Sequence, residues 1–247
     1  MPQPGAPDAM DERMLTAAGA RRINTDTEPG ELVLPAEAER RLGWIAEWLT
    51  QPPQLWSEWG LQHYLDGGLR ALFRGPSGTG KTMAAVALAQ GTGRALIQVD
   101  GTAQAFGELF GAAEKAKAIL LFDGAGDDLS GLLRRIEPFA GLAIVETDDG
   151  SGKLGAGTVG RLDVIVDFPL PDAAARRQLW EKLLATAKLD KSAVDTAKLG
   201  ADHALSGAEI LRAVRMAALL ATSAGKPLDM ELLEAAAGER SAMRSGG

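Results

Sequence analysis

The sequence contains no cysteine and only two histidines among its 247 residues. The absence of cysteine excludes disulfide bonds, thiolate nucleophiles and metal centres with cysteine ligands. His63 and His203 lie far apart in the chain, and neither has a partner at a ligand spacing, so a histidine metal site is not expected. Aromatic residues make up only 5% of the chain. The core is therefore expected to consist of leucine, alanine, valine and isoleucine.

Long apolar runs and an excess of basic charge are also missing. The longest strictly apolar stretches, such as AAVALA and AILLF, are far shorter than the roughly 20 residues that span a membrane. The first residues, MPQPGAPDAMDERM, contain no apolar segment of a secretory signal. The net charge of −7 argues against a nonspecific surface for nucleic acid or anionic membranes. We therefore expect a cytoplasmic protein that binds neither nucleic acid nor membrane.

The beginning of the chain is rich in proline, glycine and polar residues. Such a composition buries too little apolar surface to offset the entropy of ordering, so we expect a disordered tail over residues 1–34. The run that follows places Leu42, Ile45, Trp48 and Leu49 on one helical face. This spacing predicts an amphipathic helix over 35–51 at the start of the folded part.

Beyond residue 68, short apolar runs alternate with helical patterns. The apolar runs have the length of buried strands, at residues 69–73, 95–99, 118–122, 142–146 and 163–168. Continuous apolar strands separated by helices are typical of a parallel sheet covered on both faces. We therefore predict an α/β core over 35–170. From 171 onward only helical patterns remain, which predicts a small all-helical domain over 171–240 and a flexible tail over 241–247.

A phosphate-binding pattern lies between the first predicted strand and the next predicted helix. Residues 75–82 read GPSGTGKT, which fits G-x-x-x-x-G-K-[ST] in the context that this loop requires. The glycines allow backbone N–H groups to surround an anion, and the helix that follows adds its positive N-terminal dipole. Lys81 would bring a cation to the outer phosphates and the Thr82 hydroxyl would bind Mg²⁺. The candidate nucleotide-binding residues here are Gly75, Pro76, Ser77, Gly78, Thr79, Gly80, Lys81, Thr82 and Met83.

Four phrases together resemble the AAA branch of the AAA+ ATPases: RGPSGTGKTMAA, AILLFD, FPLPDAAARRQLW and LSGAEILRAVRMAALLA. The resemblance covers roughly residues 35–238. Within that branch, LVLPAEAERRL followed by WSEWG is most similar to the AAA proteins encoded with contractile injection, phage-tail-like particles. The resemblance implies a P-loop core with five parallel strands in the order 5-1-4-3-2 and a helical lid that closes over ATP. It also implies assembly with other AAA subunits, commonly into a hexameric ring.

The resemblance assigns roles to single residues. Lys81 and Thr82 match the Walker A lysine and threonine, and Asp123 matches the Walker B aspartate, so Thr82 and Asp123 would hold Mg²⁺ beside ATP. Three further positions align with the stretches that contact the base and the ribose: Gly60, Gly207 and Ala208.

Other positions depart from the family pattern. The Walker B glutamate, which polarises the attacking water, is replaced by Gly124. The sensor 1 position is usually asparagine, and the aligned residue is Asp148, whose carboxylate would repel the γ-phosphate unless it is protonated or paired. Arg161 alone aligns with the paired arginines that reach the ATP of a neighbouring subunit. Asp148 and Arg161 are therefore the two catalytic candidates.

The segment between Asp100 and Asp123 is too short for the aromatic pore loop of a threading motor and a full helix. No aromatic-glycine phrase of that loop is recognisable in it. Phe106 and Phe110 stand four residues apart, which predicts that they face the core from one side of a helix.

Three hypotheses remain open at this point. The first is an ATP-binding switch or assembly subunit with weak or absent hydrolysis. The second is an active Mg-ATP hydrolase that remodels or assembles proteins, in which another acid activates the water. The candidate acids are Asp127, Asp128, Glu146 and Asp148. The third is an interaction module that binds no nucleotide.

Overall fold

The computed structural model describes residues 10–24, 32–51, 58–60, 67–102, 106–123, 128–148, 154–187, 189 and 193–245. The chain divides into two compact units. The first consists of Met1–Thr27, Ala36–Gly75 and Lys81–Asp167, and the second of Glu28–Pro35, Pro76–Gly80 and Phe168–Gly247. Among the described residues, no helix is both long and apolar enough to cross a membrane.

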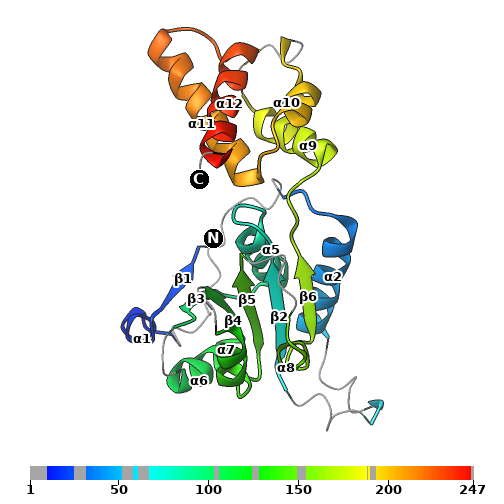
Figure 1. Ribbon diagram of the computed structural model, residues 1–247. Helices are drawn as coiled ribbons and strands as arrows, with labels where there is room; N and C mark the ends of the chain where they lie inside the picture. Colours follow the sequence, from blue (N-terminus) through cyan, green and yellow to red (C-terminus); the bar gives the residue numbers. More distant parts are fainter. Residues whose placement is uncertain are drawn as a thin grey trace. The chain divides into compact units, whose positions relative to one another are not determined.

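The first unit is built on one six-stranded sheet (Figure 1). Its strands are β1 (Ala20–Ile23), β2 (Leu69–Arg74), β3 (Leu96–Asp100), β4 (Ile119–Asp123), β5 (Leu142–Thr147) and β6 (Val164–Asp167). Their order is β1-β3-β4-β5-β2-β6, and β2 to β6 pair in parallel. All parallel strands therefore end at the same edge of the sheet, where an α/β protein forms its sites.

The expected five-stranded sheet in the order 5-1-4-3-2 needs a correction, because the sheet has a sixth strand at its edge. β1 runs antiparallel to β3 and places Ala20 opposite Val99 and Ile23 opposite Leu96. Without β1, the five parallel strands lie in the order β6-β2-β5-β4-β3, counted from the edge formed by β6.

Residues 10–24 also correct the expectation of a disordered tail over 1–34. They contain a short helix, α1 (Glu12–Ala17), as well as β1. Asp11 caps α1 by accepting a hydrogen bond from the Arg13 N–H, and Leu15 is buried in the main core. The prolines, glycines and polar residues of the segment as a whole concealed the few apolar side chains, such as Leu15 and Ala20, that anchor it in the core.

Helices surround the sheet and supply the rest of the core of the first unit. They are α2 (Ala36–Thr50), α5 (Lys81–Thr92), α6 (Gly107–Ala116), α7 (Leu129–Ile136) and the single turn α8 (Ala156–Val159). All four residues of β4 from Ile119 to Phe122 are fully buried. Since successive side chains of a strand point to opposite faces, both faces of the sheet are covered at β4.

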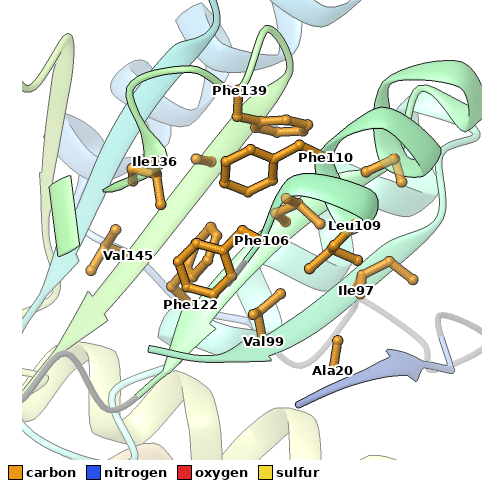
Figure 2. Close-up of a cluster of buried hydrophobic side chains, with 14 of the residues drawn as sticks. Ala20, Ile97, Val99, Phe106, Leu109, Phe110, Phe122, Ile136, Phe139 and Val145 are labelled. Atoms are coloured by element: carbon orange, nitrogen blue, oxygen red, sulfur yellow. The ribbon is translucent and has the colours of Figure 1, made fainter. Parts of the chain in front are cut away.

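A cluster of four aromatic rings connects α6, the segment that follows α7, and the sheet (Figure 2). The ring of Phe106 stacks on Phe110 with centroids 5.5 Å apart and meets Phe122 edge-on at 5.4 Å. Phe139 lies 5.2 Å from Phe110. Pairs of this kind contribute about 0.5–1.5 kcal/mol beyond the burial of their area. The prediction that Phe106 and Phe110 face the core is confirmed, since both are buried.

The regular structure of the second unit is helical in the part of the chain that is described. Its helices are α9 (Ala173–Leu184), α10 (Thr196–Asp202), α11 (Gly207–Ala224) and α12 (Met230–Ser245). They pack around Trp180, which is fully buried, together with Leu199, Ile210 and Leu233. α12 continues to Ser245, so the helix extends into the segment 241–247 that we expected to be flexible.

The buried anchor of α1 leads to a stability prediction. Leu15 is 2% exposed, so Leu15→Ala should lower the free energy of unfolding by about 2–5 kcal/mol. Urea denaturation followed by circular dichroism measures this change. Arg13→Ala alters an exposed residue of the same helix and should change stability by no more than about 0.5 kcal/mol. Equal effects of the two substitutions would contradict the packing of α1 against the core.

Candidate functional site

The loop between β2 and α5 has the backbone geometry of an anion cradle. Gly75, Gly78 and Gly80 have φ angles of 150°, 80° and 103°, a region that residues with a side chain rarely adopt. A Cβ at Gly78 would lie 2.8 Å from the Cβ of Ala208 and 2.9 Å from the Oγ of Ser206, both in the same unit. Glycine is therefore required at this position by conformation and by space.

The backbone N–H groups of this loop are available to a ligand. Among the described residues, no protein group accepts a hydrogen bond from the N–H of Ser77, Gly78, Thr79 or Gly80. The Thr79 hydroxyl donates to the carbonyl of Pro76 at 2.8 Å, which stabilises the turn from within. Successive N–H groups in such a turn, followed directly by a helix N-terminus, form a site for phosphate.

Lys81, the first residue of α5, is buried and held in place. Its ammonium group donates to the carbonyl of Gly75 at 2.6 Å and to the Oδ1 of Asp148 at 2.7 Å. The lysine side chain is 7% exposed, whereas that of Asp148 is 71% exposed. Asp148 therefore neutralises the buried lysine, although most of its own side chain remains exposed to solvent.

Thr82 follows on the same turn and bonds to a different acid. Its hydroxyl donates to the Oε2 of Glu146 at 3.1 Å. Glu146 lies on β5, is 9% exposed, and its second oxygen, Oε1, is buried without a hydrogen-bond partner. Burial raises the pKa of Glu146 to about 7, and the negative charges of Asp123 and Asp148 act in the same direction against the opposing effects of Thr82 and Lys81.

Asp123, the last residue of β4, is exposed and bonds to a neighbouring strand. The side-chain amide of Gln98 on β3 donates to its Oδ2 at 3.1 Å. The Oε1 of Gln98 in turn accepts from the Nε and Nη2 of Arg21 on β1, at 3.0 and 2.6 Å. A chain of side chains thus runs from the edge strand β1 to the candidate metal ligand.

These groups fit the phosphates of a nucleotide and its Mg²⁺. The loop offers N–H donors, Lys81 offers a cation, and Thr82 offers a hydroxyl at the start of a helix. In the described part of the chain, no three His, Asp or Glu side chains gather as a metal site of their own. Mg²⁺ on a nucleotide needs no such cluster, because phosphates and water supply most of its ligands.

The comparison with protein families agrees with this geometry. Residues 71–127 match the ATPase family associated with various cellular activities (AAA). The matched segment runs from β2 to just beyond β4 and contains the loop, Lys81, Thr82 and Asp123. The match supports an AAA-family ATPase domain, with nucleotide binding as its general function. A comparison with curated proteins gives no match.

One further acid considered for water activation, Asp128, can also be placed. Asp128 is the N-cap of α7, and its carboxylate accepts a hydrogen bond from the Gly131 N–H at 2.9 Å. The carboxylate of Asp128 therefore caps the start of α7, and we withdraw it as a candidate base. Gly124 and Asp127 fall in 124–127, which lies outside the described residues.

Arg161 is not brought to the loop of its own chain. It follows α8 and precedes β6, so it lies near the amino end of that strand, whereas Lys81 follows the carboxyl end of β2. Its guanidinium forms an ion pair with Glu137, which follows α7. Within this chain, Arg161 therefore contacts neither Lys81 nor Asp148.

The remaining candidates lie in separate places. Gly207 and Ala208 begin α11, where the Ala208 N–H donates to the carbonyl of Gly78 at 3.1 Å within the second unit. Ser206 and Glu209 form a capping box at the same helix start. Gly60 has a φ of 67° and is exposed, between two stretches that are not described. Met83 on α5 is 40% exposed.

Sequence reasoning missed two features of this site. Gln98 was not considered, and its position in a parallel strand next to β4 is the only signal that could have found it. Glu146 was named only as one of four acids that could activate water, and its bond to Thr82 was not foreseen. An acid in the otherwise apolar run LAIVE is the signal that singles out Glu146, because such a strand is buried on both faces.

The buried carboxyl group of Glu146 predicts a pH dependence of stability. Its pKa is about 7 in the folded chain against an ordinary value of 4.5. Between these values the folded chain keeps a proton that the unfolded chain loses, so stability falls as the pH rises from about 4.5 to 7 and then levels off. The total fall from this group is at most about 3 kcal/mol.

Glu146→Gln removes the titration and keeps the shape. Without nucleotide and in EDTA, the parent should lose stability relative to this variant between pH 5 and pH 8, as measured by urea unfolding. Glu181→Gln is the control, because Arg177 lowers the pKa of this exposed acid and no such trend is expected in that range. Parallel pH profiles of the parent and Glu146→Gln would refute the assignment.

Proposed function

We propose that this chain binds ATP with Mg²⁺ at the loop 75–82 and acts in the cytoplasm as a nucleotide-dependent switch or assembly subunit with weak or absent hydrolysis. The observation that carries the proposal is the state of Lys81. Its buried ammonium group lies at the end of an N–H-lined loop and is neutralised by an exposed acid, Asp148, at 2.7 Å. A phosphate entering the loop would compete with Asp148 for this cation.

The exchange of partners on Lys81 is what makes the site a switch. Without nucleotide, Asp148 ties the end of β5 to the first turn of α5. With nucleotide, the outer phosphates would take the lysine and Asp148 would be released into water, where it is already 71% exposed. Asp148 would thereby have two arrangements, paired with Lys81 or released, selected by differential binding of the nucleotide.

The residues at three positions, Gly124, Asp128 and Asp148, favour weak hydrolysis. Gly124 provides no carboxylate at the position where the family polarises water, and Asp128 is engaged as a helix cap. Asp148 brings a negative charge to the position where an asparagine would hold the water against the γ-phosphate. A negative group there opposes the charge that develops on the phosphoryl oxygens in the transition state.

Assembly with a second copy or with another AAA subunit is part of the proposal. Arg161 contacts no group of the loop in its own chain, and its ion pair with Glu137 keeps it on the far edge of the sheet from Lys81. This position suits an arginine that serves the nucleotide of a neighbouring subunit. The resemblance to AAA proteins encoded with contractile injection particles suggests such a particle as the setting for assembly.

A second candidate function is an active Mg-ATP hydrolase that remodels or assembles proteins. The observation in its favour is Glu146, a buried carboxyl beside Thr82 whose pKa is raised by burial to about 7. A general base is most effective when its pKa lies near the working pH. Phosphate release distinguishes this candidate from the switch.

Lys81→Ala tests nucleotide binding and hydrolysis together. Mg-ATP should raise the melting temperature of the parent and leave that of Lys81→Ala unchanged, because binding stabilises only a chain that has the site. Phosphate release by the two proteins should be equal within error. Release by the parent clearly above that of the variant would favour the hydrolase. If Mg-ATP at millimolar concentration shifts neither protein, the proposal of a nucleotide site fails.

Asp148→Asn tests the competition for Lys81. Removing the negative charge should tighten ATP binding by about fivefold, equivalent to about 1 kcal/mol for a partly exposed ion pair. The affinity for ADP should rise less, because ADP lacks the γ-phosphate that the carboxylate of Asp148 repels. Isothermal titration with both nucleotides measures the difference. Asp100→Asn changes an exposed acid that bonds to Thr102 and should leave both affinities unaltered. Weaker ATP binding by Asp148→Asn would contradict the competition.

A further inference from the structure

The identity of the acid that supports the magnesium-binding threonine follows from the hydrogen bonds around it. We propose that Glu146 on β5 is the carboxylate that holds Thr82 and the Mg²⁺ shell of the bound nucleotide, a role that the resemblance assigned to Asp123 on β4. This inference rests on the proposed nucleotide site and names the metal-site residue within it.

The contact of Thr82 is the first observation. A threonine hydroxyl that gives a lone pair to Mg²⁺ still has a proton to donate, and a carboxylate is a suitable acceptor. In this chain the acceptor is Glu146 Oε2 at 3.1 Å. The two residues are placed by adjacent elements, since Thr82 is the second residue of α5 and Glu146 lies on β5, which pairs with the strand that leads into the loop.

The second observation is the unused oxygen of Glu146. Oε1 is buried and has no hydrogen-bond partner in the described part of the chain, although the residue is only 9% exposed. A buried carboxylate oxygen without a partner is costly, and such groups in native proteins have a reason. A divalent cation or one of its water ligands would satisfy this oxygen, and Lys81 alone does not.

The third observation is the hydrogen bond that Asp123 accepts from Gln98. Its Oδ2 accepts from Gln98, which is itself held by Arg21, and the residue is exposed. Asp123 is therefore bonded toward β3 and β1, away from the strand β5 that carries Glu146. Its charge still acts on Glu146, whose pKa it raises. Asp123 thus contributes to the field of the site, while the contact with Thr82 belongs to Glu146.

This assignment also accounts for an acid in an unusual place. β5 is otherwise apolar, with Leu142 to Val145 all buried. A buried acid in such a strand costs free energy unless it is paired. Binding of the metal would repay this cost in the nucleotide-bound state. A carboxylate committed to Thr82 and the metal is then not free to take a proton from water, which agrees with weak hydrolysis.

The experiment measures how much Mg²⁺ strengthens ATP binding. Isothermal titration gives the ATP dissociation constant with Mg²⁺ and in EDTA, and their ratio is the magnesium gain. Glu146→Gln should reduce this gain by tenfold or more relative to the parent, as losses of metal-site partners do by roughly 10–100-fold, while the constant in EDTA changes little. Asp123→Asn is the matched control and should retain most of the gain.

A double-mutant cycle with Thr82 separates this role from a change in folding. Thr82→Val removes the hydroxyl, and combining it with Glu146→Gln should cause little further loss of the magnesium gain, because the two residues act as one unit. The inference would be overturned if Asp123→Asn lost the magnesium gain while Glu146→Gln retained it. Retained magnesium gain with abolished phosphate release in Glu146→Gln would also overturn it, by assigning Glu146 to water. If the parent binds no ATP, the proposed function fails and this inference fails with it.

Discussion

The positive charge of Lys81 is the feature on which the candidate site depends. The side chain is almost fully buried at the start of α5, and a buried ammonium group is stable only with partners. The carbonyl of Gly75 and the carboxylate of Asp148 provide them within 2.7 Å. Asp148 pairs with this cation, and the charges of Lys81, Asp123 and Asp148 all act on the pKa of the buried Glu146. One cation and three acids thus lie at the carboxyl edge of the sheet.

The fold explains how these groups meet. Parallel strands end at one edge, so residues that follow β2, β4 and β5 come together although more than twenty residues separate each from the next. Gly75 donates its N–H to the carbonyl of Thr147 at 3.1 Å, which joins the beginning of the loop to the end of β5. The loop, Glu146 and Asp148 are thereby tied to the same pair of strands, and a change at Lys81 is felt directly at the end of β5.

Much of the fold and the core of the site could be predicted from the sequence, because the strongest signals are local. The spacing of glycines, Lys81 and Thr82 specifies a loop between a strand and a helix, and β2 and α5 lie where that spacing puts them. The apolar runs specified buried strands for the same reason. The bond from Thr82 to Glu146 could not be predicted, since it depends on which side of β5 faces the loop and on the rotamer of a single glutamate. The helix cap at Asp128 depends on where α7 begins, which is the least certain property of a sequence-predicted helix.

The error about the first 34 residues and the proposed role of Glu146 have a common origin. Composition averages over a segment, and it therefore missed that Leu15 and Ala20 are buried and that β1 completes the edge of the sheet. β1 brings Arg21 to Gln98, and Gln98 brings its amide to Asp123. An unpredicted strand is thus linked by hydrogen bonds to Asp123, the acid that the sequence made most conspicuous. Asp123 is thus bonded toward β3, while the hydroxyl of Thr82 donates to Glu146 on β5. The metal-site role that we propose for Glu146 would offset the cost of burying this acid.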